Sequence, residues 1–188
     1  EDVLNSSNLL LKVNCPLEKE IEKLKQKTIL VGMFNPSKNT KLIDEIAKKK
    51  INLFSLELLP RITRAQSMDV LSSQSNLAGY RAVIDTIFEF EKAVPMMMTA
   101  AGTVPAAKIL VIGAGVAGLQ ATATAKRLGA IVSATDVRAA SKEQVESLGG
   151  KFLTVDQNDE METSGGYAKE ASEDYKKKQA EMMRDALI

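Results

Sequence analysis

Three glycines at a fixed spacing give the strongest chemical signal in this sequence. Gly113, Gly115 and Gly118 form the pattern G-x-G-x-x-G. The pattern follows the apolar segment Ile109–Ile112 and opens a helical segment over Val116–Leu128, which is the context that a dinucleotide-binding turn requires. The first glycine would permit the tight turn, the second would let the backbone approach a pyrophosphate, and the third would let helix and strand pack closely. Unpaired N–H groups at the start of the helix would then face the phosphates.

An acidic residue completes the pattern. Asp136 ends the next strand-like segment, 18 residues after Gly118, close to the spacing of about 20 residues expected for an acid that binds adenosine ribose. A carboxylate there would repel a 2′-phosphate, which favours NAD(H) over NADP(H), although Arg138 slightly weakens that preference. The alternative is a glycine-rich turn with a helix-capping aspartate. We favour dinucleotide binding because turn, context and acid agree. The remaining expected nucleotide contacts are Val116, Ala117, Val137 and Arg138.

Composition excludes several classes of enzyme. The 188 residues contain no histidine and one cysteine, Cys15. Ser-His-Asp and Cys-His nucleophilic catalysis, histidine-ligated metals and a histidine acid/base are therefore absent from this chain, and we expect no metal site. A net charge of +1 argues against a nucleic-acid binder. No segment reaches the roughly 18 apolar residues of a membrane span, and the acidic start has no signal-peptide pattern.

Apolar patterning predicts two α/β regions joined by a long helix. The chain begins without methionine at Glu1 and stops within a helical pattern at Ile188, so we expect a piece of a longer protein. Residues 1–75 would form a partial first α/β domain, residues 76–104 a linking helix and hinge, and residues 105–188 a Rossmann domain that is incomplete at its C-terminal end. The expected strands are Asn8–Val13, Thr28–Phe34, Ile51–Leu59, Ile109–Ile112, Ile131–Thr135 and Lys151–Val155. The expected helices are Leu17–Lys27, Lys41–Lys50, Asn76–Val94, Val116–Leu128, Ser141–Leu148 and Tyr167–Leu187, with a linker over Pro95–Ala107 and a loop over Asp156–Gly166.

Three long runs carry a resemblance to a known family. They are RAQSMDVLSSQSNLAGYRAV (Arg64–Val83), PMMMTAAGTVP (Pro95–Pro105) and the segment from Gly113 to Phe152 that begins GAGVAGLQATATAKRLGA. The sequence resembles the NAD(H)-binding component (domain I, alpha subunit) of proton-translocating NAD(P) transhydrogenase, in the superfamily that includes alanine dehydrogenase. A fourth run, Gly165–Glu181, is similar to that family's mobile loop and the helix after it. The resemblance implies a Rossmann domain plus part of a second flavodoxin- or Rossmann-like domain.

The resemblance also implies roles for particular residues. Asp136 matches the ribose acid, and Tyr167 matches a mobile-loop tyrosine that folds over the bound nucleotide. The alternative for Tyr167 is a core residue that starts a helix. Ala171 stands where the family usually has methionine, so loop closure would be weaker or differently packed. Four residues match those lining the nicotinamide end of the site and are the catalytic candidates, although a polar surface loop is the alternative: Arg61, Gln66, Asp69 and Ser72.

The family reaction implied by the resemblance is NADH + NADP⁺ ⇌ NAD⁺ + NADPH. NAD(H) would bind this chain and NADP(H) a partner component, while a membrane-spanning component moves protons. The family component is a homodimer, peripheral on the matrix face of the mitochondrial inner membrane or the cytoplasmic face of a bacterial one. Two rivals stay open. One is an alanine-type amino-acid dehydrogenase, which places a histidine where Ile29–Pro36 has none, and the other is a non-catalytic NAD(H)-binding module.

Overall fold

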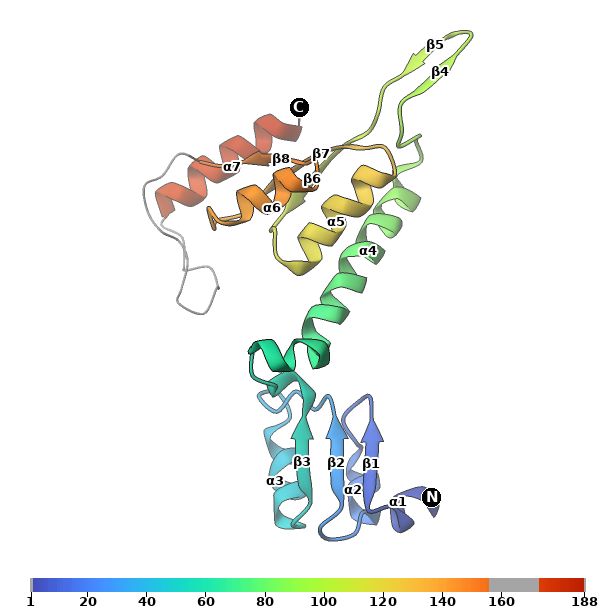
Figure 1. Cartoon of the computed structure of the whole chain (residues 1–188), viewed down its shortest axis with the longest axis vertical. Coiled ribbons are helices and arrows are strands. Elements are labelled where there is room, and N and C mark those ends of the chain that lie inside the picture. The colour runs from blue at the N-terminus through green and yellow to red at the C-terminus, as the bar shows by residue number, and fades with distance from the viewer. Residues whose placement is uncertain (1, 156–172, 188) are drawn as a thin grey trace. The chain divides into compact units, whose positions relative to one another are not determined.

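The computed structural model describes residues 2–155 and 173–187 (Figure 1). The chain divides into two compact units, Glu1–Ser73 and Gln74–Ile188, and each is described by itself. Each unit contains a three-stranded parallel sheet, with strand orders β1-β2-β3 and β6-β7-β8. Parallel strands joined by helices are typical of α/β proteins. The α/β fold class is therefore confirmed.

The first unit packs its helices against one face of its sheet (Figure 1). The side chains of Leu30 and Phe34 are fully buried beneath Ile21 and Ile46 of the two longer helices. Alternate residues of the strands point the other way, which leaves Phe54 59% exposed. The strands are β1 (Leu9–Lys12), β2 (Ile29–Gly32) and β3 (Asn52–Ser55), and the helices are α1 (Asp2–Ser6), α2 (Glu18–Lys23) and α3 (Thr40–Lys48).

The segment after β3 differs from the prediction. The strand expected over Ile51–Leu59 ends at Ser55, and the 3-10 helices η1 (Leu56–Leu58) and η2 (Thr63–Met68) follow. The carboxylate of Glu57 accepts hydrogen bonds from the backbone N–H groups of Phe34, at 2.7 Å, and Asn35. These bonds tie the segment to the loop after β2, which is why it leaves the strand direction.

Helix α4 (Val70–Phe90) begins six residues before its predicted start at Asn76 and ends before Val94. Asp69 explains the early start, because its side chain accepts a hydrogen bond from the backbone N–H of Ser72 at 2.9 Å. Glu91 explains the end, because its φ of +55° lies in the left-handed region, which stops the helix.

Gly79 lets α4 approach helix α5 (Val116–Arg127) closely. A Cβ atom at Gly79 would lie 2.0 Å from the backbone oxygen of Ala117. Val83, one turn later, is buried in a cluster that includes Ala125 and Val132. The second unit therefore includes most of α4.

Alanine at Gly79 should destabilise the protein, although alanine normally favours a helix over glycine by about 1 kcal/mol. The added methyl group would overlap the Ala117 backbone, and such overpacking costs about 1–3 kcal/mol. Thermal unfolding of Gly79→Ala checks this prediction. The exposed neighbour Asn76 is the control, and Asn76→Ala should keep or raise the melting temperature. Equal effects of the two substitutions would contradict the packing described here.

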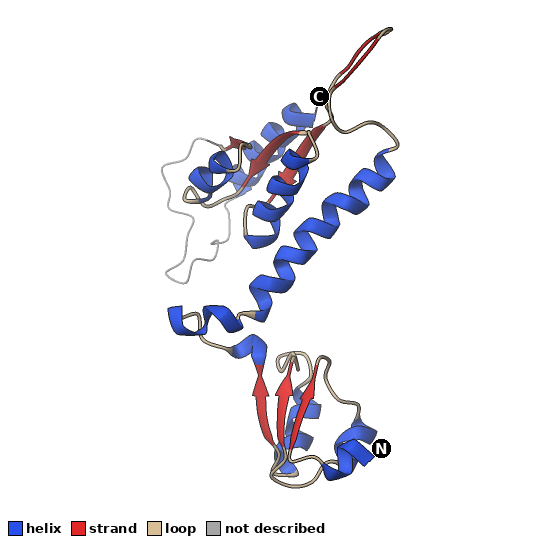
Figure 2. Cartoon of the chain, turned by 45° about the vertical axis from the view of Figure 1, so that its right-hand side comes forward, coloured by secondary structure: helices blue, strands red, loops and turns tan. Residues whose placement is uncertain are grey.

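A β-hairpin occupies the segment that was predicted to be a flexible linker. Strands β4 (Met97–Thr99) and β5 (Gly102–Val104) pair antiparallel, and the hairpin extends away from the β6-β7-β8 sheet (Figure 2). The Thr99 hydroxyl donates a hydrogen bond to the Gly102 carbonyl at 2.9 Å, which closes the turn. All residues of both strands are exposed.

The second unit has helices on both faces of its sheet (Figure 1). Ala134 and Val145 are fully buried between the sheet and helices α5 and α6, and α7 lies along the opposite face. The elements are β6 (Lys108–Ile112), β7 (Ile131–Thr135), β8 (Lys151–Leu153), α6 (Ser141–Ser147) and α7 (Glu173–Leu187). The predicted start and end of β7 are confirmed, whereas β8 is two residues shorter than expected.

Helices α6 and α7 differ in their local side-chain contacts. The N-cap residue of α6 is Ala140, which forms no side-chain cap. On α7, Asp174 pairs with Lys178 at 3.1 Å and Glu173 pairs with Lys176. The predicted loop over 156–166 and the predicted start of the last helix at 167 lie outside the described residues.

Candidate nucleotide site

Two of the three glycines in the turn between β6 and α5 are required by the fold itself. Gly113 has a φ of +94°, and its N–H donates a hydrogen bond to the Thr135 carbonyl at 2.8 Å, which ties the turn to the end of β7. A Cβ atom at Gly118 would lie 1.7 Å from the backbone oxygen of Gly113. Neither position accepts a side chain without rearrangement of the turn.

Gly115 is different, because no structural requirement explains it. Its φ of −76° suits any residue, and it stands at the N-cap of α5. A Cβ atom there would find its nearest neighbour, the Nη2 atom of Arg138, 4.0 Å away. The position next to Gly115 is therefore open. The first N–H groups of a helix have no partner within the helix, so those of α5, at Val116 and Ala117, are the donors that a phosphate group here would meet.

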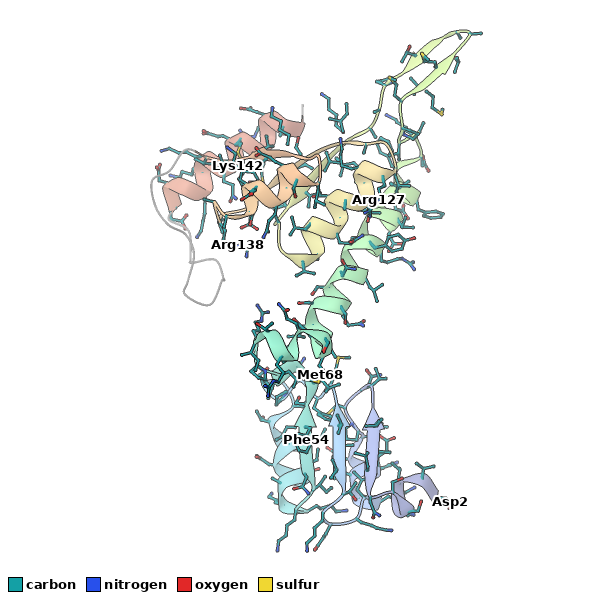
Figure 3. The ribbon with its side chains drawn as sticks, in the orientation of Figure 1. Asp2, Phe54, Met68, Arg127, Arg138 and Lys142 are labelled. Atoms are coloured by element: carbon teal, nitrogen blue, oxygen red, sulfur yellow. The ribbon has the colours of Figure 1, made fainter. Side chains whose placement is uncertain are left out.

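Asp136 lies directly behind this turn. One carboxylate oxygen, Oδ2, accepts a hydrogen bond from the Ala114 N–H at 2.7 Å. The other, Oδ1, accepts one from the Arg138 N–H at 2.9 Å. The Arg138 guanidinium, labelled in Figure 3, binds both oxygens, with Nε 3.0 Å from Oδ1 and Nη2 3.1 Å from Oδ2. The acid predicted from sequence spacing therefore meets the glycine turn.

The charge of Asp136 is stabilised in a nearly buried position. Its side chain is 8% exposed and that of Arg138 is 22% exposed. Burial alone would raise the pKa of Asp136, but the hydrogen bonds from Arg138 and Ala114 outweigh burial and bring the pKa below its ordinary value. Asp136 caps neither α5 nor α6 through these bonds, because its two backbone donors, Ala114 and Arg138, both lie outside those helices.

The nicotinamide-end candidates belong to the first unit. Asp69 and Ser72 are brought together, since the Ser72 hydroxyl donates to Asp69 Oδ2 at 2.6 Å in addition to the backbone bond that caps α4. These bonds from Ser72 lower the pKa of Asp69. Gln66 and Arg61 are exposed on the same segment. The backbone carbonyl of Gln66 accepts a hydrogen bond from the backbone N–H of Asp69 at 3.2 Å.

The hydrogen bonds between Asp69 and Ser72 and the ion pair between Asp136 and Arg138 were not predicted from the sequence, although each has a local signal. The spacing of Asp69 and Ser72 is that of an N-cap and the third residue of a helix, which signals the start of α4. The D-x-R spacing of Asp136 and Arg138 signals a local ion pair. Val137 lies between them and is partly buried. Tyr167, the remaining candidate, lies outside the described residues.

The described residues offer neither a metal cluster nor a membrane-spanning helix. Within residues 2–155 and 173–187, no group of three or more Cys, Asp or Glu side chains is arranged to hold a metal ion. Across the same ranges, no helix has the length and apolar character needed to cross a bilayer.

Comparisons with known proteins agree with the two-unit organisation. The family described as "Alanine dehydrogenase/PNT, N-terminal domain" matches residues 1–78, and "Alanine dehydrogenase/PNT, C-terminal domain" matches residues 82–187. The chain is 56% identical, over 98% of its length, to the first part of NAD(P) transhydrogenase subunit alpha of Rhodospirillum rubrum, and covers 50% of that protein. It therefore spans about half the length of this relative.

A solved structure and a more distant relative complete the comparison. The crystal structure of transhydrogenase from Sinorhizobium meliloti matches with a TM-score of 0.78 and 58% identity, over 80% of this chain and 46% of that one. Alanine dehydrogenase 2 of Staphylococcus aureus is 26% identical over 80% of this chain and 41% of its own length. Both domain profiles of one family thus match in order along the sequence, and the chain belongs to the alanine dehydrogenase/PNT family of oxidoreductases, as a homologue of the transhydrogenase alpha subunit.

Proposed function

We propose that this chain is part of the NAD(H)-binding component of a proton-translocating NAD(P) transhydrogenase, which passes hydride directly between NADH and NADP⁺. The observation that carries the proposal is the open glycine turn at Gly115 with the ionised Asp136 behind it. The chain is more than twice as identical in sequence to a transhydrogenase subunit as to an alanine dehydrogenase. This difference favours hydride transfer between nucleotides over an alanine-type reaction.

In the proposed reaction the chain acts by positioning. The nicotinamide ring supplies the hydride chemistry, so the residues need only bind, orient and exclude water. The start of α5 would hold the pyrophosphate, with its N–H groups pointing to the negative charge. Asp136 would select the ribose with a free 2′-hydroxyl, and Tyr167 would fold over the nucleotide.

The nicotinamide ring would be positioned by Asp69 and Ser72, whose side chains are already hydrogen-bonded to each other. The Ser72 hydroxyl gives its proton to Asp69, so its oxygen offers lone pairs to a donor such as a carboxamide NH₂. Gln66 and Arg61, exposed on the preceding segment, would hold the ring towards the second nicotinamide carried by the NADP(H)-binding component.

Gln66→Asn should slow hydride transfer by about tenfold or more, because shortening a positioning side chain misplaces the reacting atoms. The affinity for NADH should stay nearly unchanged. Stopped-flow transfer rates and equilibrium titration with NADH separate the two effects. Gln74→Asn makes the same change at an exposed position of α4 and should alter neither quantity. A large loss of affinity at an unchanged transfer rate would refute the positioning role.

The proposed partners are the NADP(H)-binding component, the membrane-spanning component and a second copy of this chain. The complex would place this chain peripherally on the matrix face of the mitochondrial inner membrane or the cytoplasmic face of a bacterial one. Support for the homodimer comes from exposed apolar side chains in the second unit: Leu77, Tyr80, Phe88, Met97 and Met98.

Phe88, which is 82% exposed, should contribute to self-association. Phe88→Ser should shift the chain from dimer to monomer in sedimentation velocity and leave its circular dichroism spectrum unchanged, since the ring buries little within one chain. Glu89→Ser, at the next and also exposed position, is the control and should leave the dimer intact. A wild-type chain that sediments as a monomer would remove the homodimer from the proposal.

A reconstituted transfer assay tests the proposed function. The chain is mixed with a purified NADP(H)-binding component, NADH and an NADP⁺ analogue, and reduction of the analogue is followed by absorbance. Transfer is the expected result. Oxidation of NADH by pyruvate and ammonia would instead establish the alanine-type reaction, and NADH binding without any transfer would leave a binding module.

A further inference from the structure

The carboxylate that is proposed to bind ribose is already fully hydrogen-bonded in the free chain. Oδ1 of Asp136 accepts from the backbone N–H and the Nε of Arg138, and Oδ2 accepts from the Ala114 N–H and the Arg138 Nη2. An ionised carboxylate offers about four lone-pair positions. Four donors therefore occupy the capacity that two ribose hydroxyls would need.

Only two of the four donors can leave without disturbing the turn. The N–H groups of Ala114 and Arg138 belong to the backbone, and Ala114 is 1% exposed within the glycine turn. The other two donors sit at the end of the long Arg138 side chain, which is 22% exposed. A rotation of that side chain frees one acceptor position on each oxygen and keeps the two backbone bonds.

The same guanidinium lies at the edge of the open space at Gly115. Its Nη2 atom is the group nearest to the place of a Cβ atom on Gly115, at 4.0 Å. One side chain therefore covers the ribose acid and reaches the edge of the open space at Gly115. A nucleotide has to compete with Arg138 for Asp136.

We propose that Arg138 is a specificity-determining residue that occupies the ribose site from within and withdraws when the 2′- and 3′-hydroxyls bind Asp136. This inference rests on the proposed function, because it assumes that the turn binds NAD(H). In this inference Arg138 competes with the nucleotide for Asp136, whereas a residue that only contacts the nucleotide would add to its affinity. As an occupant, the guanidinium reduces what the ribose hydroxyls contribute to affinity, whereas a ligand that stacks on adenine or binds phosphate leaves that contribution unchanged.

A comparison of two nucleosides isolates this competition. Adenosine and 2′,3′-dideoxyadenosine share the base and lack phosphate, so stacking and phosphate contacts cancel in the ratio of their affinities. The ratio is measured by NMR titration of the chain and of Arg138→Met, which keeps a long apolar stem without donors. Arg138→Lys, with a single ammonium in place of the two-pronged donor, is the second variant.

Removal of the competitor should raise the preference for adenosine about tenfold in Arg138→Met, the size of a hydrogen bond to a charged group, with a smaller rise in Arg138→Lys. If Arg138→Met does not fold, as judged by its melting curve, the lysine variant decides. An unchanged or smaller preference, with NADH still bound by the wild-type chain, overturns only this inference. A wild-type chain that does not bind NADH overturns the proposed function as well.

Discussion

Gly118→Ala should unfold or strongly destabilise the second unit, whereas Gly115→Ala should leave it folded and unable to hold a nucleotide tightly. The two substitutions add the same methyl group to one turn. At Gly118 the methyl carbon would lie 1.7 Å from the Gly113 backbone oxygen, so we expect a loss of about 3 kcal/mol or more in the free energy of unfolding. At Gly115 alanine fits the backbone, since φ is −76° and no backbone atom is nearby.

The effect of Gly115→Ala should appear in binding. The methyl group would point into the space proposed for the pyrophosphate. A steric penalty of about 2–3 kcal/mol there corresponds to a loss of roughly 30–150-fold in NADH affinity. Chemical denaturation and calorimetric titration of both variants give the two quantities. Unchanged NADH binding in Gly115→Ala would show that the phosphates do not lie over this glycine.

A second large change is expected at Asp136. Asp136→Asn should weaken NADH binding by about 1–3 kcal/mol more than NADPH binding, because a buried charged acceptor for the ribose hydroxyls is lost while repulsion of a 2′-phosphate is removed. Fluorescence titration with each nucleotide measures both affinities. Equal losses for NADH and NADPH would show that Asp136 is not the ribose ligand.

The same substitution should make stability less dependent on pH. The pKa of Asp136 is lower in the folded chain than its ordinary value of 3.8, so its charge stabilises the fold above pH 3.8 and that contribution is lost as pH falls through the folded pKa. The difference in unfolding free energy between wild type and Asp136→Asn should therefore be constant near neutral pH and shrink below about pH 4. A difference that grows on acidification would contradict the ion pair with Arg138.

Sequence patterns were sufficient to predict the structure where backbone geometry requires a particular type of residue. The turn at Gly113 and Gly118 and strand β7 (Ile131–Thr135) follow the prediction, because only glycine fits the turn and the strand is a short apolar run. The number of residues between the turn and Asp136 was also predictable, since one helix and one strand occupy that part of the sequence.

Patterns were not sufficient where tertiary contacts choose between alternatives. The helical spacing of the apolar residues on α4 predicts a single stripe over Leu77, Tyr80, Ile84, Ile87 and Phe88. In the described chain this stripe is divided, because Leu77, Tyr80 and Phe88 are exposed. Ile87 instead packs against the core cluster that contains Val83. Propensity alone did not place the start of α4, because the cap comes from one Asp–Ser pair. The hairpin was not predicted because its strands have three residues each, too few for an alternating pattern to stand out.

Titration of the chain with NADH and with NADPH is the decisive measurement for the proposed nucleotide site. If the glycine turn and Asp136 form that site, the chain binds NADH. It binds NADPH more weakly by at least about tenfold, since the 2′-phosphate of NADPH meets an ionised carboxylate. A chain that binds neither nucleotide, or binds NADPH as tightly as NADH, would contradict the site described here.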